Sequence, residues 1–125
     1  MTSHGVIQLG FDPPSTAIVS VGGTLGRAAR EDLVLALAAA GEREHIVVDL
    51  SQAESVDPAL VNAVQQASEH LIGTPARLEL VIPAAAHALR SLFETVGAVS
   101  IAPVHTTRAL ALAALDGGRR GRHAA

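Results

Sequence analysis

The stretch HIVVDLSQAESVDPAL spans residues 45–60 and predicts a strand, a loop and the start of a helix. Residues 45–50 form an almost continuous apolar run, which is typical of a strand covered on both faces of a parallel sheet. We expect residues 51–56 to form a loop. Asp57 is then a good N-cap, and Pro58 suits the first helical position. The stretch therefore predicts a helix that starts shortly after a buried strand.

Further strands and helices alternate on both sides of this stretch. Apolar and β-branched runs predict the strands, helical spacing of apolar residues predicts the helices, and Gly or Pro marks their ends. The expected strands cover residues 6–9, 16–21 (ended by Gly22 and Gly23), 78–82 and 99–102. The expected helices cover residues 27–40 (stopped by Gly41), a segment from Asp57 to the turn Gly73-Thr74-Pro75, a segment after Pro83 that ends at Gly97, and a segment from the cap Thr106 to about Leu115.

The predicted element order is β-β-α-β-α-β-α-β-α. Alternating strands and helices predict an α/β fold, with a mostly parallel sheet against which about four helices pack. The first two strands would form a hairpin across the turn at residues 12–15, so the first strand would be the antiparallel exception. We expect one domain over residues 1–116, followed by a disordered Gly- and Arg-rich tail over residues 117–125.

The composition of the 125-residue chain excludes several classes of function. The net charge of -3 and the absence of Trp and Tyr leave neither a basic field nor stacking platforms for nucleic acid. The absence of Cys excludes disulfides and thiolate chemistry, and the absence of Lys excludes Schiff-base and P-loop chemistry. No apolar run is long enough to span a membrane, and the first residues do not resemble a signal peptide. We therefore expect a cytoplasmic protein that neither binds nucleic acid nor inserts into a membrane.

Two polar segments invite comparison with known phosphate sites. The turn Gly22-Gly23-Thr24-Leu25-Gly26-Arg27 follows a strand and opens a helix, but its spacing is not that of a dinucleotide-binding motif. A tight strand-to-helix turn that needs Gly explains it better. Asp49 lies near a strand end, where a receiver domain has its phosphoacceptor, but the further acids and the Lys of such a site are absent. We interpret Asp49 as a polar residue that hydrogen-bonds a neighbouring loop or the backbone.

Other catalytic or metal-binding patterns find no support in the sequence. The His residues are scattered and no two have the spacing of a local zinc pair; they are His4, His45, His70, His87, His105 and His123. No G-x-S-x-G elbow supports acyl transfer. We interpret the basic residues Arg119, Arg120 and Arg122 as a solvated tail. We therefore expect no catalytic residue, no metal and no cofactor.

The order of these motifs resembles the STAS domains, the family of sulfate-transporter and anti-sigma factor antagonist modules. In that family an apolar strand, Asp-Leu-Ser and a short loop precede Asp-Ser-Ser/Thr-Gly-Leu at the start of a helix, and residues 45–57 resemble this strand and loop. The segment LRSLFETVG, residues 89–97, resembles the third helix of the family. Residues 19–25 lie where the family has a strand that ends in Gly-Glu-Leu-Asp. The resemblance covers about residues 6–115 and implies a STAS-like fold.

The sequence departs from the family at its signature. Asp57 matches the signature Asp, but Pro58 stands where anti-sigma factor antagonists have the phosphorylated Ser or Thr. Thr24 and Gly26 stand where the family has acidic residues, and Ser55 does not match the motif. Because Pro has no hydroxyl, the resemblance implies that phosphorylation control is absent at this position, and we expect no phosphoacceptor there.

The resemblance implies a non-catalytic protein-interaction module, an anti-sigma factor antagonist that binds an anti-sigma factor kinase. Its partner-binding surface would consist of Gly23, Thr24, Gly26, Arg27, Ser55, Asp57, Pro58, Ala59, Val61 and Asn62. An accessory or scaffold subunit of a larger assembly fits the altered signature as well, for example a STAS-like subunit that binds the ABC ATPase of a lipid-transport complex. A small-molecule binder, with its site at the carboxyl ends of the sheet, is a third alternative.

Overall fold

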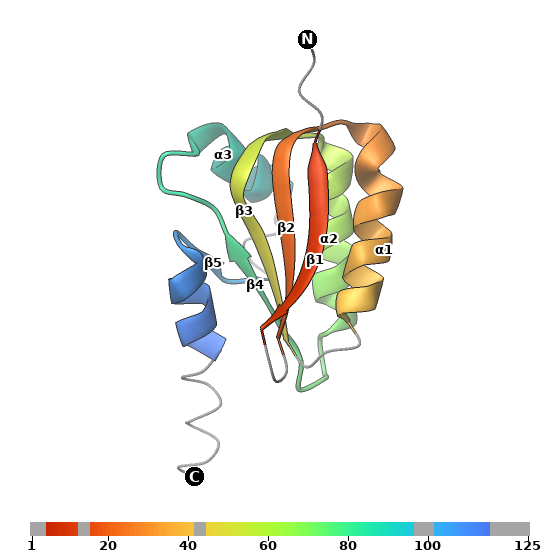
Figure 1. Cartoon of the computed structure of the whole chain (residues 1–125), viewed down its shortest axis with the longest axis vertical. Helices are drawn as coiled ribbons and strands as arrows, with labels where there is room; N and C mark the ends of the chain where they lie inside the picture. The colour runs from red at the N-terminus through yellow and green to blue at the C-terminus, as the bar shows by residue number, and fades with distance from the viewer. Residues whose placement is uncertain (1–4, 13–15, 42–44, 97–101, 116–125) are drawn as a thin grey trace.

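Strands and helices alternate along the chain, as predicted (Figure 1). The computed structural model describes residues 5–12, 16–41, 45–96 and 102–115. The strands are β1 (Val6–Asp12), β2 (Thr16–Leu25), β3 (His45–Val56), β4 (Arg77–Val81) and β5 (Val104–His105). The helices are the 3-10 turn η1 (Arg27–Ala29), α1 (Arg30–Ala40), α2 (Pro58–His70) and α3 (His87–Val96). Residues 108–115 form a last helix.

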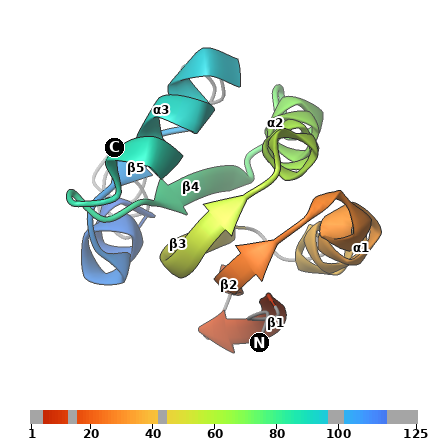
Figure 2. The same cartoon turned by 90° about the horizontal axis from the view of Figure 1, so that it is seen from above.

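The strands form one sheet in the order β1-β2-β3-β4-β5. β1 runs antiparallel to β2 over residues 6–12, which is longer than predicted, and the other neighbours are parallel. Helices α1, α2 and α3 cover one face, and the helix of residues 108–115 lies on the opposite face (Figure 2). The predicted α/β fold, with its antiparallel first strand, is confirmed.

The central strands are buried on both faces of the sheet. In β3, Ile46 and Val48 pack into the core beneath α1, α2 and α3, whereas Val47 faces the other side. Ala111 and Leu115 of the last helix cover Val47. Because helices cover both faces of the sheet, side chains on both sides of β3 are shielded from water. This explains the nearly continuous apolar run at residues 45–50.

β2 and β3 both continue further than the sequence predicts. β2 passes through Gly22 and Gly23 instead of ending there, and residues 51–56 are strand instead of loop. The two extensions pair with each other, with Thr24 opposite Ser55 and an irregular register around the glycines. Gly23 has a φ of 76°, which Gly adopts without strain. Most side chains of the β3 extension are exposed and polar, so it lacks the apolar pattern that reveals a buried strand.

Two helix starts also differ from the prediction. The helix expected over residues 27–40 begins as the 3-10 turn η1, and the α-helix itself starts at Arg30. The last helix is capped by Thr107 instead of Thr106, because the Thr107 hydroxyl accepts a hydrogen bond from the backbone N–H of Leu110 at 3.2 Å. Both differences are shifts along correctly predicted helices.

One strand predicted near the C-terminus is corrected, and several of the residues predicted around it lie outside the described residues. The strand expected over residues 99–102 is wrong at Ala102, which lies in a bend, and the last strand is β5. Residues 99–101 are not among those described, and neither are Gly97 and the expected tail 117–125. The domain boundary at residue 116 stays a prediction.

Candidate functional site

The carboxyl ends of β2 and β3 meet the start of α2 at one end of the sheet (Figure 1). Thr24 pairs with Ser55, and Leu25 pairs with Val56. The backbone N–H of Asp57 donates a hydrogen bond to the Leu25 carbonyl at 3.0 Å. The segment after β2 and the segment before α2 therefore form one continuous surface, although they are distant in the sequence.

Asp57 and Pro58 start α2 as the sequence predicts. Asp57 has an extended backbone, and its Oδ1 accepts a hydrogen bond from the backbone N–H of Ala59 at 2.9 Å. Pro58 occupies the first helical position, where its missing N–H leaves no hydrogen bond unmade. The pair therefore gives α2 a fixed starting point at the edge of this surface.

Exposure separates the predicted partner-binding residues into three groups. Thr24, Gly26, Arg27, Ser55, Pro58 and Asn62 are exposed, and Gly23, Asp57 and Ala59 are half-buried. Val61 is fully buried, so its predicted place on the surface is wrong. The reason is that α2 lies between α1 and α3 (Figure 2), so it buries a wide stripe that includes Leu60 and Val61. We call the remaining nine residues the end patch.

Polar groups of different kinds surround the end patch. The Thr24 hydroxyl donates a hydrogen bond to Glu54 Oε2 at 3.5 Å, and both side chains are exposed. Arg27 adds an exposed guanidinium from η1. Sequence reasoning did not select Glu54, because its position beside Thr24 depends on strand pairing that was predicted as a loop. The surroundings of the end patch therefore combine a hydroxyl, a carboxylate and a guanidinium.

Asp49 forms a second polar cluster, on the face of the sheet opposite α1, α2 and α3. It is 4% exposed, and its oxygens accept hydrogen bonds from the Ser51 backbone N–H at 2.9 Å and from Arg108 Nε at 2.7 Å. Arg108 also donates to the Ser20 hydroxyl at 3.1 Å. Burial disfavours the carboxylate, but these hydrogen bonds and the Arg108 charge outweigh it and hold the pKa of Asp49 below its usual value.

The interpretation of Asp49 as a structural residue is therefore confirmed: it hydrogen-bonds the backbone. Its partner Arg108 was missed, because the two residues are 59 positions apart and no local motif links them. The pair ties the last helix to β3. Arg108 is the first residue of that helix, so the contact fixes where the helix begins on the sheet.

The glycine turn at residues 22–27 does not have the geometry of a phosphate-binding loop. Gly22 and Gly23 lie inside β2 and not in a turn. The only residue between β2 and η1 is Gly26. A phosphate site at this position would need the first turn of an α-helix. Here the strand is followed by three residues of 3-10 helix instead.

The described histidines form no metal cluster, and His105 contacts a buried carboxylate. His105 Nε2 lies 3.0 Å from Glu79 Oε1, on a carboxylate that is almost completely buried. Within the described ranges, no three His, Asp or Glu side chains come together as a metal site. Among the helices that the structure describes, none has both the length and the apolar character needed to cross a membrane.

Solved structures share this fold, although no family model and no curated protein matches the sequence. An anti-sigma factor antagonist from Mycobacterium paratuberculosis has a TM-score of 0.72 and 22% identity, over 89% of this chain and 93% of that one. The anti-sigma factor antagonist SpoIIAA in its unphosphorylated form has a TM-score of 0.69 and 20% identity, over 91% and 98%. The chain has the STAS fold of the anti-sigma factor antagonists. A third structure, the Bacillus cell fate determinant SpoIIAA in its phosphorylated form, has a TM-score of 0.68 and 19% identity, over 88% and 99%.

Proposed function

We propose that this protein is a non-catalytic interaction module, an anti-sigma factor antagonist that binds an anti-sigma factor kinase through the end patch. The shared STAS fold supports the general kind of function. The observation that carries the proposal is the pairing of Thr24 with Ser55, which joins the end of β2 to the start of α2 in one exposed surface. In this proposal the protein acts in the cytoplasm, without a cofactor.

The chemistry at position 58 supports a partner surface without phosphorylation control. One of the solved structures with this fold is a phosphorylated form, so a phosphate is compatible with the fold. A phosphate adds nearly two negative charges, which can abolish docking at a helix start. Pro58 is exposed but carries no hydroxyl, and it cannot accept a phosphate. Binding through the end patch would therefore be constitutive.

Affinity capture from native lysate tests the proposal when patch and control variants are compared. Asn62→Arg places a bulky charge in the end patch at an exposed position of α2. Ala39→Arg is the control, because Ala39 is exposed near the far end of α1, away from the patch. We expect the wild type and Ala39→Arg to retain an ATPase of the anti-sigma kinase class, and we expect Asn62→Arg to lose it.

The identity of the captured protein distinguishes the proposal from its main alternative. Recovery of an ABC ATPase instead of an anti-sigma factor kinase would assign the protein to a larger transport or scaffold assembly. Equal capture of the kinase by the wild type and Asn62→Arg would overturn the assignment of the end patch. Circular dichroism of both variants checks that each retains the fold.

A further inference from the structure

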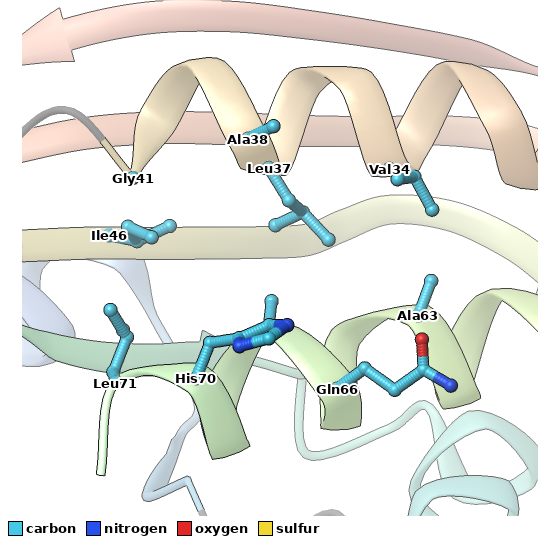
Figure 3. Close-up of a pocket in the computed structure, with 10 residues that line it drawn as sticks. Val34, Leu37, Ala38, Gly41, Ile46, Ala63, Gln66, His70 and Leu71 are labelled. Carbon is cyan, nitrogen blue, oxygen red and sulfur yellow. The ribbon is translucent and has the colours of Figure 1, made fainter.

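A groove of about 450 Å³ lies between α1 and α2 (Figure 3). Buried Leu37 and Ile46 contribute to its apolar wall. The groove stays open because small residues line it where larger ones would fill it, namely Ala38, Gly41, Ala63 and Ala67. Its volume lies within the range of small-molecule sites in proteins.

Gln66 and His70 are the polar residues among those that line the groove, and each can donate a hydrogen bond. Gln66 and His70 extend from α2 along its wall (Figure 3). Arg30 donates a hydrogen bond to Gln66 Oε1 at 3.3 Å. Arg30 is not itself a lining residue, but it lies one helical turn before Val34, which is. None of the lining residues that the structure describes is acidic, so no carboxylate in this lining repels a negatively charged ligand.

The helix directions favour one orientation for such a ligand. The amino end of α1 carries a partial positive charge and holds Arg30, and the exposed acids Glu31 and Asp32 of the same turn are not among the residues that line the groove. The carboxyl end of α1, near Gly41, carries a partial negative charge and would repel an anion. A negative head group therefore belongs at the Arg30–Gln66 end, and an apolar tail would extend toward Gly41 and Leu71.

The dimensions of the groove suit a single extended chain better than a helix of a partner protein. From Arg30 to the lining residue Gly41 the rise along α1 is about 16 Å at 1.5 Å per residue, roughly the length of an extended fatty acid of about twelve carbons. A partner helix with its side chains is about 10 Å wide. The groove lies between α1 and α2, which are neighbours in one layer of helices (Figure 2), and a chain without side chains is narrower than a helix.

We propose that the groove between α1 and α2 binds a single-chain apolar carboxylate, a medium-chain fatty acid. The carboxylate would pair with the Arg30 guanidinium and accept a hydrogen bond from the Gln66 amide. The alkyl chain would lie against Leu37 and Ile46. None of the described lining residues belongs to the end patch, so the site does not depend on the proposed function.

Titration of the full chain with dodecanoate, below the concentration at which it forms micelles, tests the site. Ala38→Leu fills the groove, whereas Ala39→Leu makes the same change on the adjacent exposed residue, which does not line it. We expect the wild type and Ala39→Leu to show saturable one-site binding by calorimetry. We expect Ala38→Leu to weaken binding at least about tenfold, a change of about 1.4 kcal/mol. The proposal would be overturned if Ala38→Leu and Ala39→Leu bound dodecanoate equally tightly, or if binding to the wild type did not saturate.

The head group is tested with ligands of equal chain length. Dodecanoate should bind more tightly than dodecanol and dodecylamine, because the amino end of α1 and Arg30 favour an anion. Arg30→Gln should remove this preference while the alkyl chain still binds. Dodecylamine binding as tight as that of dodecanoate would contradict the carboxylate assignment. In nuclear magnetic resonance spectra, shifts confined to residues outside α1 and α2 would overturn the location.

Discussion

Pro58 determines both the shape and the chemistry of the end patch. Its ring fixes the backbone for the first helical turn, and the Asp57 carboxylate before it accepts the hydrogen bond from Ala59. The same ring removes the hydroxyl that a phosphoacceptor needs. One residue therefore stabilises the start of α2 and leaves that position without a phosphorylation switch.

Replacing Pro58 with Ser tests this dual role. The variant should lose about 0.4–1 kcal/mol of unfolding free energy, because Pro restricts the unfolded chain. With the captured kinase and ATP, the variant should gain one phosphate by intact-mass measurement, and the wild type should gain none. A phosphate on Ser55 or Thr24 of the wild type would show that the switch has moved along the chain instead of being lost.

Asp49 gives the molecule a defined response to acid. Its pKa is lower in the folded chain than its usual value of 3.8, so its hydrogen bonds stabilise the fold above that pH. As the pH falls through the folded pKa, the carboxylate gains a proton and this contribution is lost. Wild type should therefore lose more stability than Asp49→Asn in urea unfolding between neutral pH and about pH 3. Asp32→Asn, at an exposed position of α1, is the control and should follow the wild type.

Elements with a clear apolar pattern could be predicted from the sequence, and those without one could not. Residues 45–50 revealed β3 because helices cover both faces of the sheet there. The extension over residues 51–56 is held by backbone pairing with β2 while most of its side chains are exposed and polar, so no pattern marks it. Val61 was wrongly predicted to be exposed. It is buried because α2 packs between two other helices, and the sequence pattern of α2 alone does not show this packing.

The start of α2 is capped by Asp57, and the contribution of this cap to the free energy of unfolding can be measured. Asp57→Ala removes the acceptor for the Ala59 N–H and should cost about 1 kcal/mol of unfolding free energy. Asp57→Asn keeps an acceptor and should cost much less. Both values come from urea unfolding. A loss that is the same for both variants would mean that the charge of Asp57, and not its hydrogen bond, stabilises α2.

At the scale of the whole molecule, the fold could be predicted and the site only in part. The alternation of elements predicted the parallel sheet, and the order of motifs predicted the STAS fold that solved structures share. The sequence also placed both halves of the end patch. It could not place Glu54 beside Thr24 or Arg108 on Asp49, because these contacts join distant segments through strand register and helix packing.

The arrangement of the molecule separates two surfaces with different chemistry. The end patch combines a hydroxyl, a guanidinium and small residues at the carboxyl ends of β2 and β3. The groove between α1 and α2 is apolar, and α1 and α2 both run away from the patch (Figure 1). A protein partner at the first surface therefore leaves the greater part of the second surface accessible.

Site-specific photo-crosslinking in cells tests the central claim most directly. A photoreactive residue is placed at Asn62 in the end patch or, as the control, at Ala39 on the exposed side of α1. We predict a crosslink from position 62 to an ATPase of the anti-sigma kinase class, and none to that protein from position 39. A crosslink from position 62 to an ABC ATPase, no adduct there, or the same adduct from both positions would contradict the claim.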